Sequence, residues 1–263
     1  MRLLLIDGTN VVMRYAFAAL RDGQASPTWE QEVQVLGAVE SALRACAAAA
    51  GCRHAVVALD STNPTWRHRE FPSYKATRPA ISTGSWGSRL ELYLGERGWL
   101  CCRVDGFEAD DIAATLASRV QGARHDAAVL SGDSDLLQLA GDECHVYQFG
   151  AKGEHRFALR DQPWIAQRYG LRWSSQLGLY KAMVGEPGDN LPGVAGIGPT
   201  KARRLLRQYA TAAEMLEAGV FARPNRGQLN LMLRLVTLRE DVPLPAIQPA
   251  SCRIPAAAGQ EGQ

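Results

Sequence analysis

Acidic residues follow short apolar runs and crowd the start of a predicted helix. Asp7 follows the run 3–6, Asp60 follows the run 55–59, and a Ser-Gly-Asp-Ser-Asp stretch with Asp133 and Asp135 follows the run 127–130. Two further acidic stretches, Glu-Ala-Asp-Asp and Gly-Glu-Pro-Gly-Asp, contribute Glu108, Asp110, Asp111, Glu186 and Asp189. Any one of these acids could be a helix N-cap or a solvated side chain. That explanation does not account for the whole set.

This set of carboxylates predicts a particular chemistry. Convergent anions repel one another unless cations neutralise them. Oxygen ligands without Cys or His favour Mg²⁺ or Mn²⁺. Two such ions about 4 Å apart can activate water and stabilise the leaving oxygen of a phosphodiester. The carboxylates therefore indicate hydrolysis of a phosphate ester, by a nuclease or by a phosphatase.

A basic and aromatic segment covers residues 66–78. Its aromatic residues Trp66, Phe71 and Tyr74 interleave with a basic set that comprises Arg67, His68, Arg69, Lys75 and Arg78. A segment of this kind is either a solvated basic face or an element that grips a nucleic-acid strand. In the second case the cations meet phosphates and the rings stack on bases.

A glycine-rich segment at 191–199 leads into a predicted basic helix. The glycines are Gly193, Gly196 and Gly198, and the helix carries Lys201, Arg203, Arg204 and Arg207. Backbone amides, a helix N-terminus and basic side chains together can cradle a phosphate. The alternative is a plain glycine-rich turn. The pattern fits neither a P-loop nor a dinucleotide-binding fingerprint.

Alternating strands and helices would position these residues. We expect strands at 3–6, 55–59, 99–104, 127–130 and 145–149, with helices at 33–50, 90–98, 108–120 and 134–139. This order predicts an α/β fold, in which a parallel sheet is covered on both faces and the functional crevice lies at the carboxyl ends of its strands. After about residue 160 the pattern becomes helical, clearest at 177–184, 200–209 and 228–238. We expect a loop at 81–88 and an extended or disordered tail from 243.

Composition sets limits on function. The net charge of +2 is too small to indicate a nucleic-acid partner by itself. Six cysteines show no metal-ligand spacing, which favours reduced thiols in a reducing compartment. The N-terminal apolar run ends at Asp7 and does not resemble a signal peptide. Since no apolar stretch reaches about 18 residues, we expect no membrane partner and a cytoplasmic location.

The motifs, taken together and in order, resemble the bacterial 5′-nuclease family, which includes the 5′-nuclease domain of DNA polymerase I and small stand-alone proteins. They are the residues 5–8, Asp60, and the segments 71–79, 108–111, 132–135 and 188–198, so the resemblance covers about residues 3–210. It implies a PIN-like core at 1–170 with a basic arch at 66–98. A helical region at 171–242 would contain a helix–three-turn–helix clamp for duplex DNA, and a flexible tail would follow at 243–263.

The resemblance also implies roles for individual residues. One Mg²⁺, or Mn²⁺ in its place, would be held by Asp7, Asp60, Glu108, Asp110 and Asp111. A second ion would be held by Asp133, Asp135, Glu186 and Asp189. The catalytic residues would be Lys75, Arg78 and Asp111. DNA would be contacted by Arg14, Arg67, Arg69, Tyr74, Lys75, Arg78, Gly193, Gly196, Gly198, Lys201, Arg203 and Arg204. The backbone carbonyls of Val194 and Ile197 would bind K⁺.

The sequence departs from the family pattern in three places. Glu186 replaces the usual Asp, the arch after Pro79 is rich in Gly and Ser, and Thr200-Lys201 reverses the usual order. The resemblance predicts a monomeric, stand-alone 5′-3′ exonuclease and flap endonuclease that acts on 5′ ends and 5′ flaps in DNA replication and repair. The alternatives are a catalytically weakened DNA-structure-binding protein, a PIN-type ribonuclease and, last, a small-molecule phosphatase.

Overall fold

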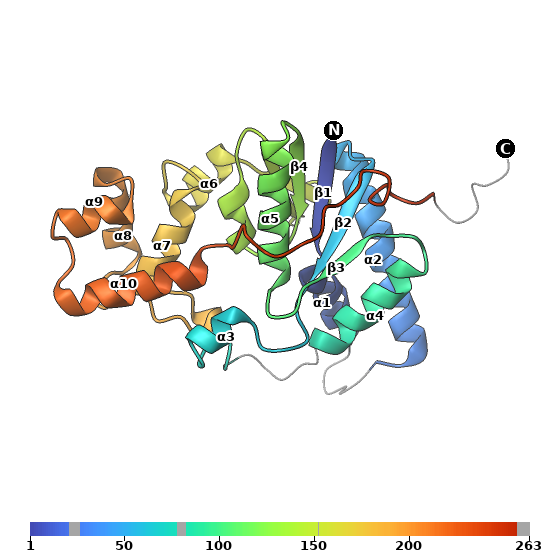
Figure 1. The fold of residues 1–263 in the computed structure, drawn as a ribbon, viewed down its shortest axis with the longest axis horizontal. Helices are drawn as coiled ribbons and strands as arrows, with labels where there is room; N and C mark the ends of the chain where they lie inside the picture. Colours follow the sequence, from blue (N-terminus) through green and yellow to red (C-terminus); the bar gives the residue numbers. More distant parts are fainter. Residues whose placement is uncertain (21–26, 78–82, 152, 257–263) are drawn as a thin grey trace.

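The computed structural model describes residues 1–20, 27–77, 83–151 and 153–256. Its α-helices and strands follow one another as β1 (Arg2–Asp7), α1 (Gly8–Ala19), α2 (Trp29–Ala50), β2 (His54–Leu59), α3 (Trp66–Glu70), α4 (Thr83–Gly95), β3 (Cys101–Arg103), α5 (Ala109–Gly122), β4 (Asp126–Leu130), β5 (Cys144–Phe149), β6 (Phe157–Arg160), α6 (Gln162–Tyr169), α7 (Gln176–Val184), α8 (Pro199–Gln208), α9 (Ala212–Glu217) and α10 (Arg223–Val236) (Figure 1). Two short 3₁₀ helices, η1 (Asp135–Leu139) and η2 (Pro187–Asp189), lie between them.

The described strands form one sheet in the order β3-β2-β1-β4-β5-β6, in which only β6 runs antiparallel to its neighbour. The central strand β1 pairs in parallel with β2 and β4, so that Leu5 lies beside both Val56 and Val129. The carboxyl ends of these three strands therefore reach the same edge of the sheet. This confirms the predicted α/β fold with a largely parallel sheet.

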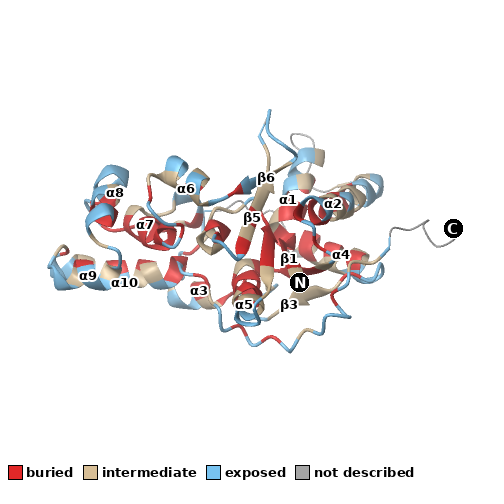
Figure 2. Cartoon of the chain, turned by 90° about the horizontal axis from the view of Figure 1, so that it is seen from above, coloured by how far each residue is buried: buried red, intermediate tan, exposed pale blue. Residues whose placement is uncertain are grey.

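Alternate side chains of β1 pack into two separate hydrophobic cores. Leu4 and Ile6 pack with α1, α2 and α4 on one face, whereas Leu3 and Leu5 pack with α5 on the other. The strand is apolar at every position because both faces of a parallel sheet are covered. Figure 2 shows this as a buried central sheet with more exposed helices outside it.

Several parts of the core region differ from the sequence prediction, which also lacked α1 and α3. β6 and α6 were not predicted, and α4 begins at Thr83, within the segment 81–88 that we expected to be a loop. Residues 81 and 82 lie outside the described part of the chain. The helix forms because Trp86, Leu90 and Leu94 recur every four residues and are buried to 3% exposure or less. That burial outweighs the low helix propensity of the Gly and Ser residues.

The C-terminal helices form an extension beside the sheet, in which α7 packs against α8 and α10 (Figure 1). The chain then returns along α5 to the sheet. Cys252 O accepts a hydrogen bond from Ala55 N at 2.7 Å, and Ile254 N donates one to Arg53 O at 2.9 Å. Residues 243–256 thus follow an extended path along the core with no helix or strand, as one of the two predicted alternatives had it, while residues 257–263 lie outside the described part of the chain.

By length and composition alone, α2 could cross a membrane. Its residues Val39, Leu43 and Cys46 are fully buried against the sheet and its neighbouring helices. A core helix of a globular protein passes the same test, so this result is weak evidence for a membrane span. Residues such as Glu40 and Arg44, which form an ion pair on α2, interrupt the apolar stretch.

Gly193 lies where two turns of backbone meet, and its substitution tests this packing. Its φ is 70°, and a Cβ atom would lie 2.5 Å from Gly185 N and 2.7 Å from Met183 O. We expect Gly193→Ala to lower the free energy of unfolding by about 2–4 kcal/mol, from left-handed backbone strain and overpacking. Denaturant unfolding followed by circular dichroism measures the change.

Gly196→Ala is the matched control, because Gly196 has a φ of 74° but nothing lies within 4 Å of its Cβ position. This variant should lose only the strain energy, about 1–2 kcal/mol. Equal losses in the two variants would contradict the close backbone approach.

Candidate metal-binding active site

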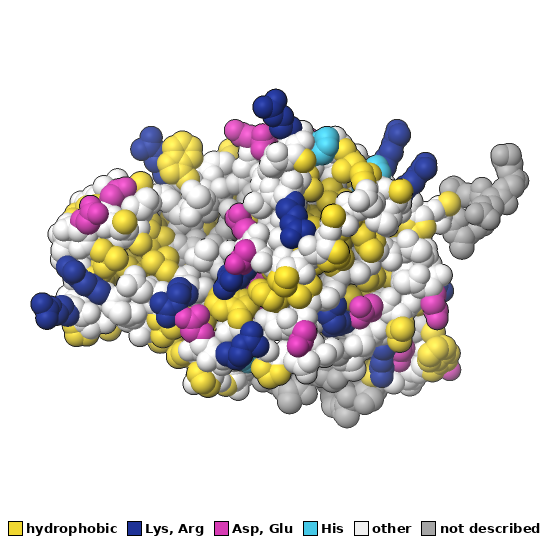
Figure 3. Space-filling view, viewed as in Figure 1, with side chains coloured by type: hydrophobic (Ala, Val, Ile, Leu, Met, Phe, Trp, Pro, Cys, Tyr) yellow, Lys and Arg dark blue, Asp and Glu magenta, His cyan; other side chains and the backbone are white. Residues whose placement is uncertain are grey.

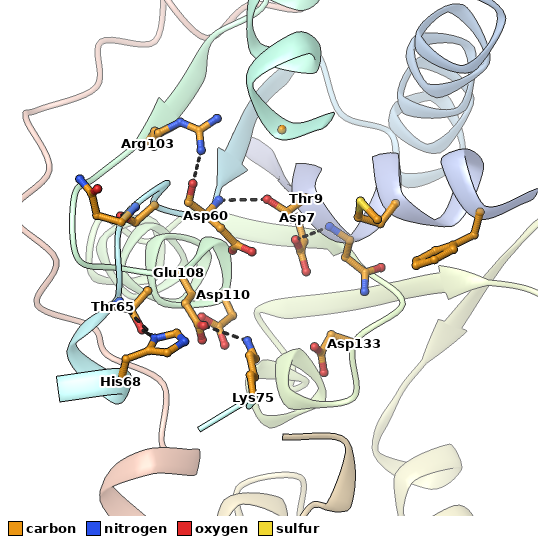
Figure 4. Close-up of a pocket in the computed structure, with 16 residues that line it drawn as sticks. Asp7, Thr9, Asp60, Thr65, His68, Lys75, Arg103, Glu108, Asp110 and Asp133 are labelled. Atoms are coloured by element: carbon orange, nitrogen blue, oxygen red, sulfur yellow. Dashed lines mark hydrogen bonds and ion pairs between the residues drawn. The ribbon is translucent and has the colours of Figure 1, made fainter. Parts of the chain in front are cut away.

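Carboxylates from three neighbouring strand ends meet in one cavity of about 500 Å³. Asp7 ends β1, Asp60 follows β2, and Asp133 lies beyond the end of β4. The start of α5 adds Glu108 and Asp110 to the lining (Figure 4). The parallel sheet and the start of α5 together thus bring five of the nine predicted metal ligands into one cavity.

Hydrogen bonds fix the orientation of the two central carboxylates. Asp7 accepts from Asn10 N at 3.0 Å and from Ser131 Oγ at 2.8 Å. Asp60 accepts from Ala109 N at 2.8 Å, which ties it to the first turn of α5. Neither residue forms an ion pair with a described Lys or Arg side chain, so each carboxylate keeps lone pairs for a further cation.

The environment of these two carboxylates is unfavourable for negative charge. Burial, followed by the nearby Asp60 and Asp133, raises the pKa of Asp7 to about 7. Burial, followed by Glu108, also raises the pKa of Asp60. Buried anions with all-oxygen donors and no ion-paired cation fit a hard divalent ion such as Mg²⁺ or Mn²⁺.

Glu108 is already neutralised by protein cations. Lys75 Nζ lies 2.8 Å from Oε1, and Arg67 Nη1 lies 2.9 Å from Oε2. Burial acts to raise the pKa of Glu108, but Lys75 and Arg67 outweigh it and lower the pKa to about 2. Tyr74, which we expected to contact DNA, is 3% exposed, and its hydroxyl lies 3.0 Å from Glu108 and 3.1 Å from Asp189.

Asp111 does not line the cavity. It is fully buried, and its two oxygens accept from Arg67 at 2.8 Å each. Trp66 Nε1 at 2.9 Å and Arg239 N at 3.0 Å complete its hydrogen bonds. The sequence places Asp111 and Glu108 on one helix face, but the first turn of α5 directs Asp111 toward the protein interior. The geometry therefore does not support our prediction of Asp111 as a metal ligand and catalytic residue.

Arg67 also differs from its predicted role as a DNA contact. Its side chain is 2% exposed and contacts Glu108, Asp110 and Asp111. Its Nε donates to Leu235 O at 2.9 Å, which connects the cavity to α10. Arg67 is therefore a buried cation, and its guanidinium group is held by protein carboxylates in this structure.

The second predicted ligand group lies beside the first. Asp135 and Glu186 both contact Lys181 of α7, whose Nζ lies 2.7 Å from Glu186 Oε2. Burial acts to lower the pKa of Lys181, but the carboxylates of Asp135 and Glu186 outweigh it and raise the pKa. Sequence analysis missed Lys181, although a lone charged residue in the otherwise uncharged helix Gln176–Val184 was an available signal.

Protein cations lie between some of the carboxylates, at Glu108 and at Asp135 and Glu186. Within the described ranges, no three acidic, His or Cys side chains already surround one point closely enough to hold an ion. Lys75 and Lys181 lie among them instead. Binding of a divalent ion would therefore require a lysine to withdraw or the carboxylates to rotate.

The predicted DNA contacts outside the cavity fall into three groups. Arg14, Arg69, Lys201 and Arg204 are exposed. Arg203 is half-buried and donates to Tyr169 O at 2.7 Å, so it anchors α8 to α6. Arg78 lies outside the described part of the chain.

The glycine-rich turn precedes α8 as predicted. Gly193 and Gly196 have positive φ, Gly198 is the N-cap of α8, and Val194 O accepts from Ile197 N at 3.0 Å.

The cavity wall also includes Met13 and the exposed Phe17 from α1, which sequence analysis did not select.

Two family models match the chain. The 5′-3′ exonuclease N-terminal resolvase-like domain matches residues 2–170, and the 5′-3′ exonuclease C-terminal SAM fold matches residues 173–258. Among solved structures, a flap endonuclease of bacteriophage T5, in a pseudo-enzyme-product complex with DNA and metal ions, has a TM-score of 0.68 at 19% identity. The match covers 91% of this chain and 89% of that one, and at this identity it concerns the fold.

Curated relatives share more sequence. DNA polymerase I of Treponema pallidum is 34% identical over 213 residues, which are 77% of this chain and 21% of the polymerase. This chain therefore spans about a fifth of that relative, and 29% of the thermostable DNA polymerase I of Thermus thermophilus. Flap endonuclease Xni of Salmonella newport is 34% identical over 191 residues, which are 71% of this chain and 72% of that protein.

The raised pKa of Asp7 predicts that divalent-ion binding depends on pH. Protons compete for its carboxylate below about pH 7, so the increase in melting temperature caused by Mn²⁺ should grow from about pH 5 to 7 and then level off. Without metal, the dependence of stability on pH has the opposite sign. The folded pKa exceeds the ordinary value of 3.8, so the contribution of Asp7 to stability falls as pH rises toward 7.

Differential scanning fluorimetry at several pH values measures both trends. Asp7→Asn should remove most of the Mn²⁺ effect, whereas Asp142→Asn, at an exposed position outside the cavity, should retain it. An equal Mn²⁺ effect in Asp7→Asn and in the unmodified protein would contradict the assignment.

Arg67→Met tests the buried cation. The substitution leaves Glu108, Asp110 and Asp111 without their shared partner, so we expect it to cost about 3–5 kcal/mol of unfolding free energy. Adding Asp111→Asn should recover part of that loss in chemical denaturation. The control variant is Arg168→Met, at an exposed position on α6. If Arg67→Met loses as little unfolding free energy as this control, the role of Arg67 is contradicted.

Proposed function

The chain belongs to the 5′-3′ exonuclease family, and we propose that it hydrolyses DNA phosphodiester bonds at 5′ ends and at 5′-flap junctions with the help of divalent metal ions. One observation carries this proposal. The carboxylates of Asp7, Asp60 and Asp110 converge from two strand ends and a helix start in a single cavity, and two of them are held in place by backbone amides. Asp7 and Asp60 form no ion pair with a described Lys or Arg side chain, and Asp110 has only the 3.5 Å contact with Arg67, so these buried carboxylates are suited to hold a divalent ion.

We assign the primary ion to three carboxylates of this cavity, Asp7, Asp60 and Asp110, with Glu108 and Asp133 beside them. Mg²⁺ is the proposed ion, with Mn²⁺ as a substitute. When bound, such ions neutralise phosphate charge, activate water and stabilise a leaving oxygen. Asp111 serves this site indirectly, because its pairing with Arg67 fixes the first turn of α5 and thereby the position of Asp110.

Lys75 is the proposed contact to the scissile phosphate. Its φ is 55°, and its backbone amide donates to Asp189 O at 2.9 Å. This turn directs the ammonium group into the cavity, where it lies on Glu108 (Figure 4). A phosphate that enters the cavity offers Lys75 a second anionic partner. Arg78 remains a proposed contact from the sequence resemblance.

The glycine-rich turn and α8 form the proposed duplex clamp. Gly193, Gly196 and Gly198 open the backbone ahead of a helix N-terminus, where exposed Lys201 and Arg204 follow. Such an arrangement suits a DNA phosphate. On the face shown in Figure 3, Lys and Arg side chains are dispersed among acidic and apolar ones, so local geometry has more weight here than net charge. K⁺ at the carbonyls of Val194 and Ile197 belongs to the same proposal.

Two regions, which overlap those matched by the family models, would divide these tasks. Residues 1–170 would cut the strand, and residues 171–242 would hold the duplex. We further propose that the protein acts as a monomer in the cytoplasm. The observation that favours a second candidate, a catalytically weakened DNA-structure-binding protein, is the ion pairing of Lys181 with the predicted ligands Asp135 and Glu186.

Cleavage of a 5′-flap duplex labelled at its 3′ end tests the proposed activity. In Mg²⁺ we expect cuts at or near the junction, with EDTA abolishing them. Asp110→Asn should reduce the rate by at least about 100-fold, since electrostatic support of the reacting phosphate is lost. Asp142→Asn should cleave normally, because Asp142 is exposed outside the cavity.

The same assay separates the alternatives. Binding of the flap without cleavage in Mg²⁺ and Mn²⁺ would support the structure-binding candidate. Faster cleavage of the matching RNA flap would support a PIN-type ribonuclease.

The salt dependence of duplex affinity tests the clamp. Lys201→Gln with Arg204→Gln should weaken duplex binding and reduce the slope of log affinity against log salt concentration by about 2, one for each lost phosphate contact. Fluorescence anisotropy with a labelled duplex measures the slope. Arg168→Gln, an exposed site on α6, is the control, and an unchanged slope in the double variant would exclude these contacts.

A further inference from the structure

Lys181 is a buried cation at the second carboxylate group. It belongs to α7, where its neighbours Leu179, Ala182 and Met183 are buried in the core. Its own side chain is 6% exposed. An ammonium group in such a place requires anionic or hydrogen-bonding partners.

The ammonium group of Lys181 has three oxygen partners. Nζ donates to Ser134 Oγ at 2.8 Å and to Glu186 Oε2 at 2.7 Å, and it also contacts Asp135 Oδ1. Three partners match the three N–H donors of a lysine. The group is therefore fully coordinated by protein atoms.

The position of Glu186 suits this arrangement. Glu186 is the N-cap of η2 and is fixed by hydrogen bonds between its backbone and that of Leu191. From there the longer stem of a glutamate reaches the ammonium group. The departure from the usual Asp of the family therefore has a structural counterpart in Lys181.

A divalent ion and Lys181 cannot share these oxygens. Mg²⁺ requires oxygen ligands at about 2.0–2.1 Å in octahedral geometry. An ammonium group on the same carboxylates would also repel the Mg²⁺ ion, because both are positively charged. Lys75 differs, because its side chain is 21% exposed and lines the cavity.

We propose that the ammonium group of Lys181 occupies the place of a second divalent ion, so that the chain binds one ion tightly, at Asp7, Asp60 and Asp110, and a second only weakly. This inference rests on the proposed metal-dependent function and specifies how many divalent ions the protein binds tightly. Lys181 acts here as a positioning residue, which supplies one fixed positive charge beside the primary ion.

Counting bound Mn²⁺ on the full-length protein tests this inference without an activity assay. Titration followed by electron paramagnetic resonance should find one tight ion per chain, with any second ion at least about tenfold weaker. Lys181→Met keeps the length of the side chain and removes its charge, and it should bring the second ion to an affinity comparable with the first. Arg168→Met, which removes an exposed cation, should leave the count at one.

The outcomes are distinguishable. Two ions of similar affinity in the unmodified protein would overturn the role of Lys181 and leave the proposed function intact. No Mn²⁺ binding at all would overturn the metal-dependent function itself. Should Lys181→Met fail to fold, the double variant Lys181→Met with Glu186→Gln replaces it, because it removes one of the two carboxylates left without a cation. The affinity of that double variant for a second ion is then compared with that of the unmodified protein. An equal or higher affinity supports the inference, and a lower affinity counts against it.

Discussion

The buried guanidinium group of Arg67 is the interaction on which the site depends. It binds both oxygens of Asp111 at 2.8 Å, contacts Glu108 and Asp110, and donates to Leu235 O. One side chain thus joins α3, the acidic start of α5 and the end of α10. Without it, three carboxylates would face one another in the interior with no counter-charge on that side.

This arrangement separates the acids into two classes. Asp111, behind the first turn of α5, is neutralised permanently, whereas Asp7, Asp60 and Asp110 face the cavity. The sheet makes this possible, since β1, β2 and β4 are adjacent and end at one edge. Protein cations on one side and a proposed divalent ion on the other would then share the charge of the cluster. Lys75 and Lys181 mark the places where an added ion would compete with a protein cation.

The sequence predicted the main fold and the carboxylates of the cavity for a physical reason. Apolar runs that end in Asp, such as those before Asp7 and Asp60, determine both the strand and the position of the acid. It could not assign Arg67, because a basic residue beside an exposed Arg69 gives no sign that it is buried by α10. The pairing of Asp111 with Arg67, 44 residues away, and that of Lys181 with Asp135, 46 residues away, were not predictable for the same reason. The start of α4 depends on long-range burial of Trp86.

Diffraction from crystals soaked in Mn²⁺, with data at the manganese edge, tests the central claim most directly. The account predicts an anomalous peak within coordination distance of Asp7, Asp60 or Asp110, with Asp111 still paired to Arg67. A peak coordinated by Asp111, with Arg67 displaced, would contradict it.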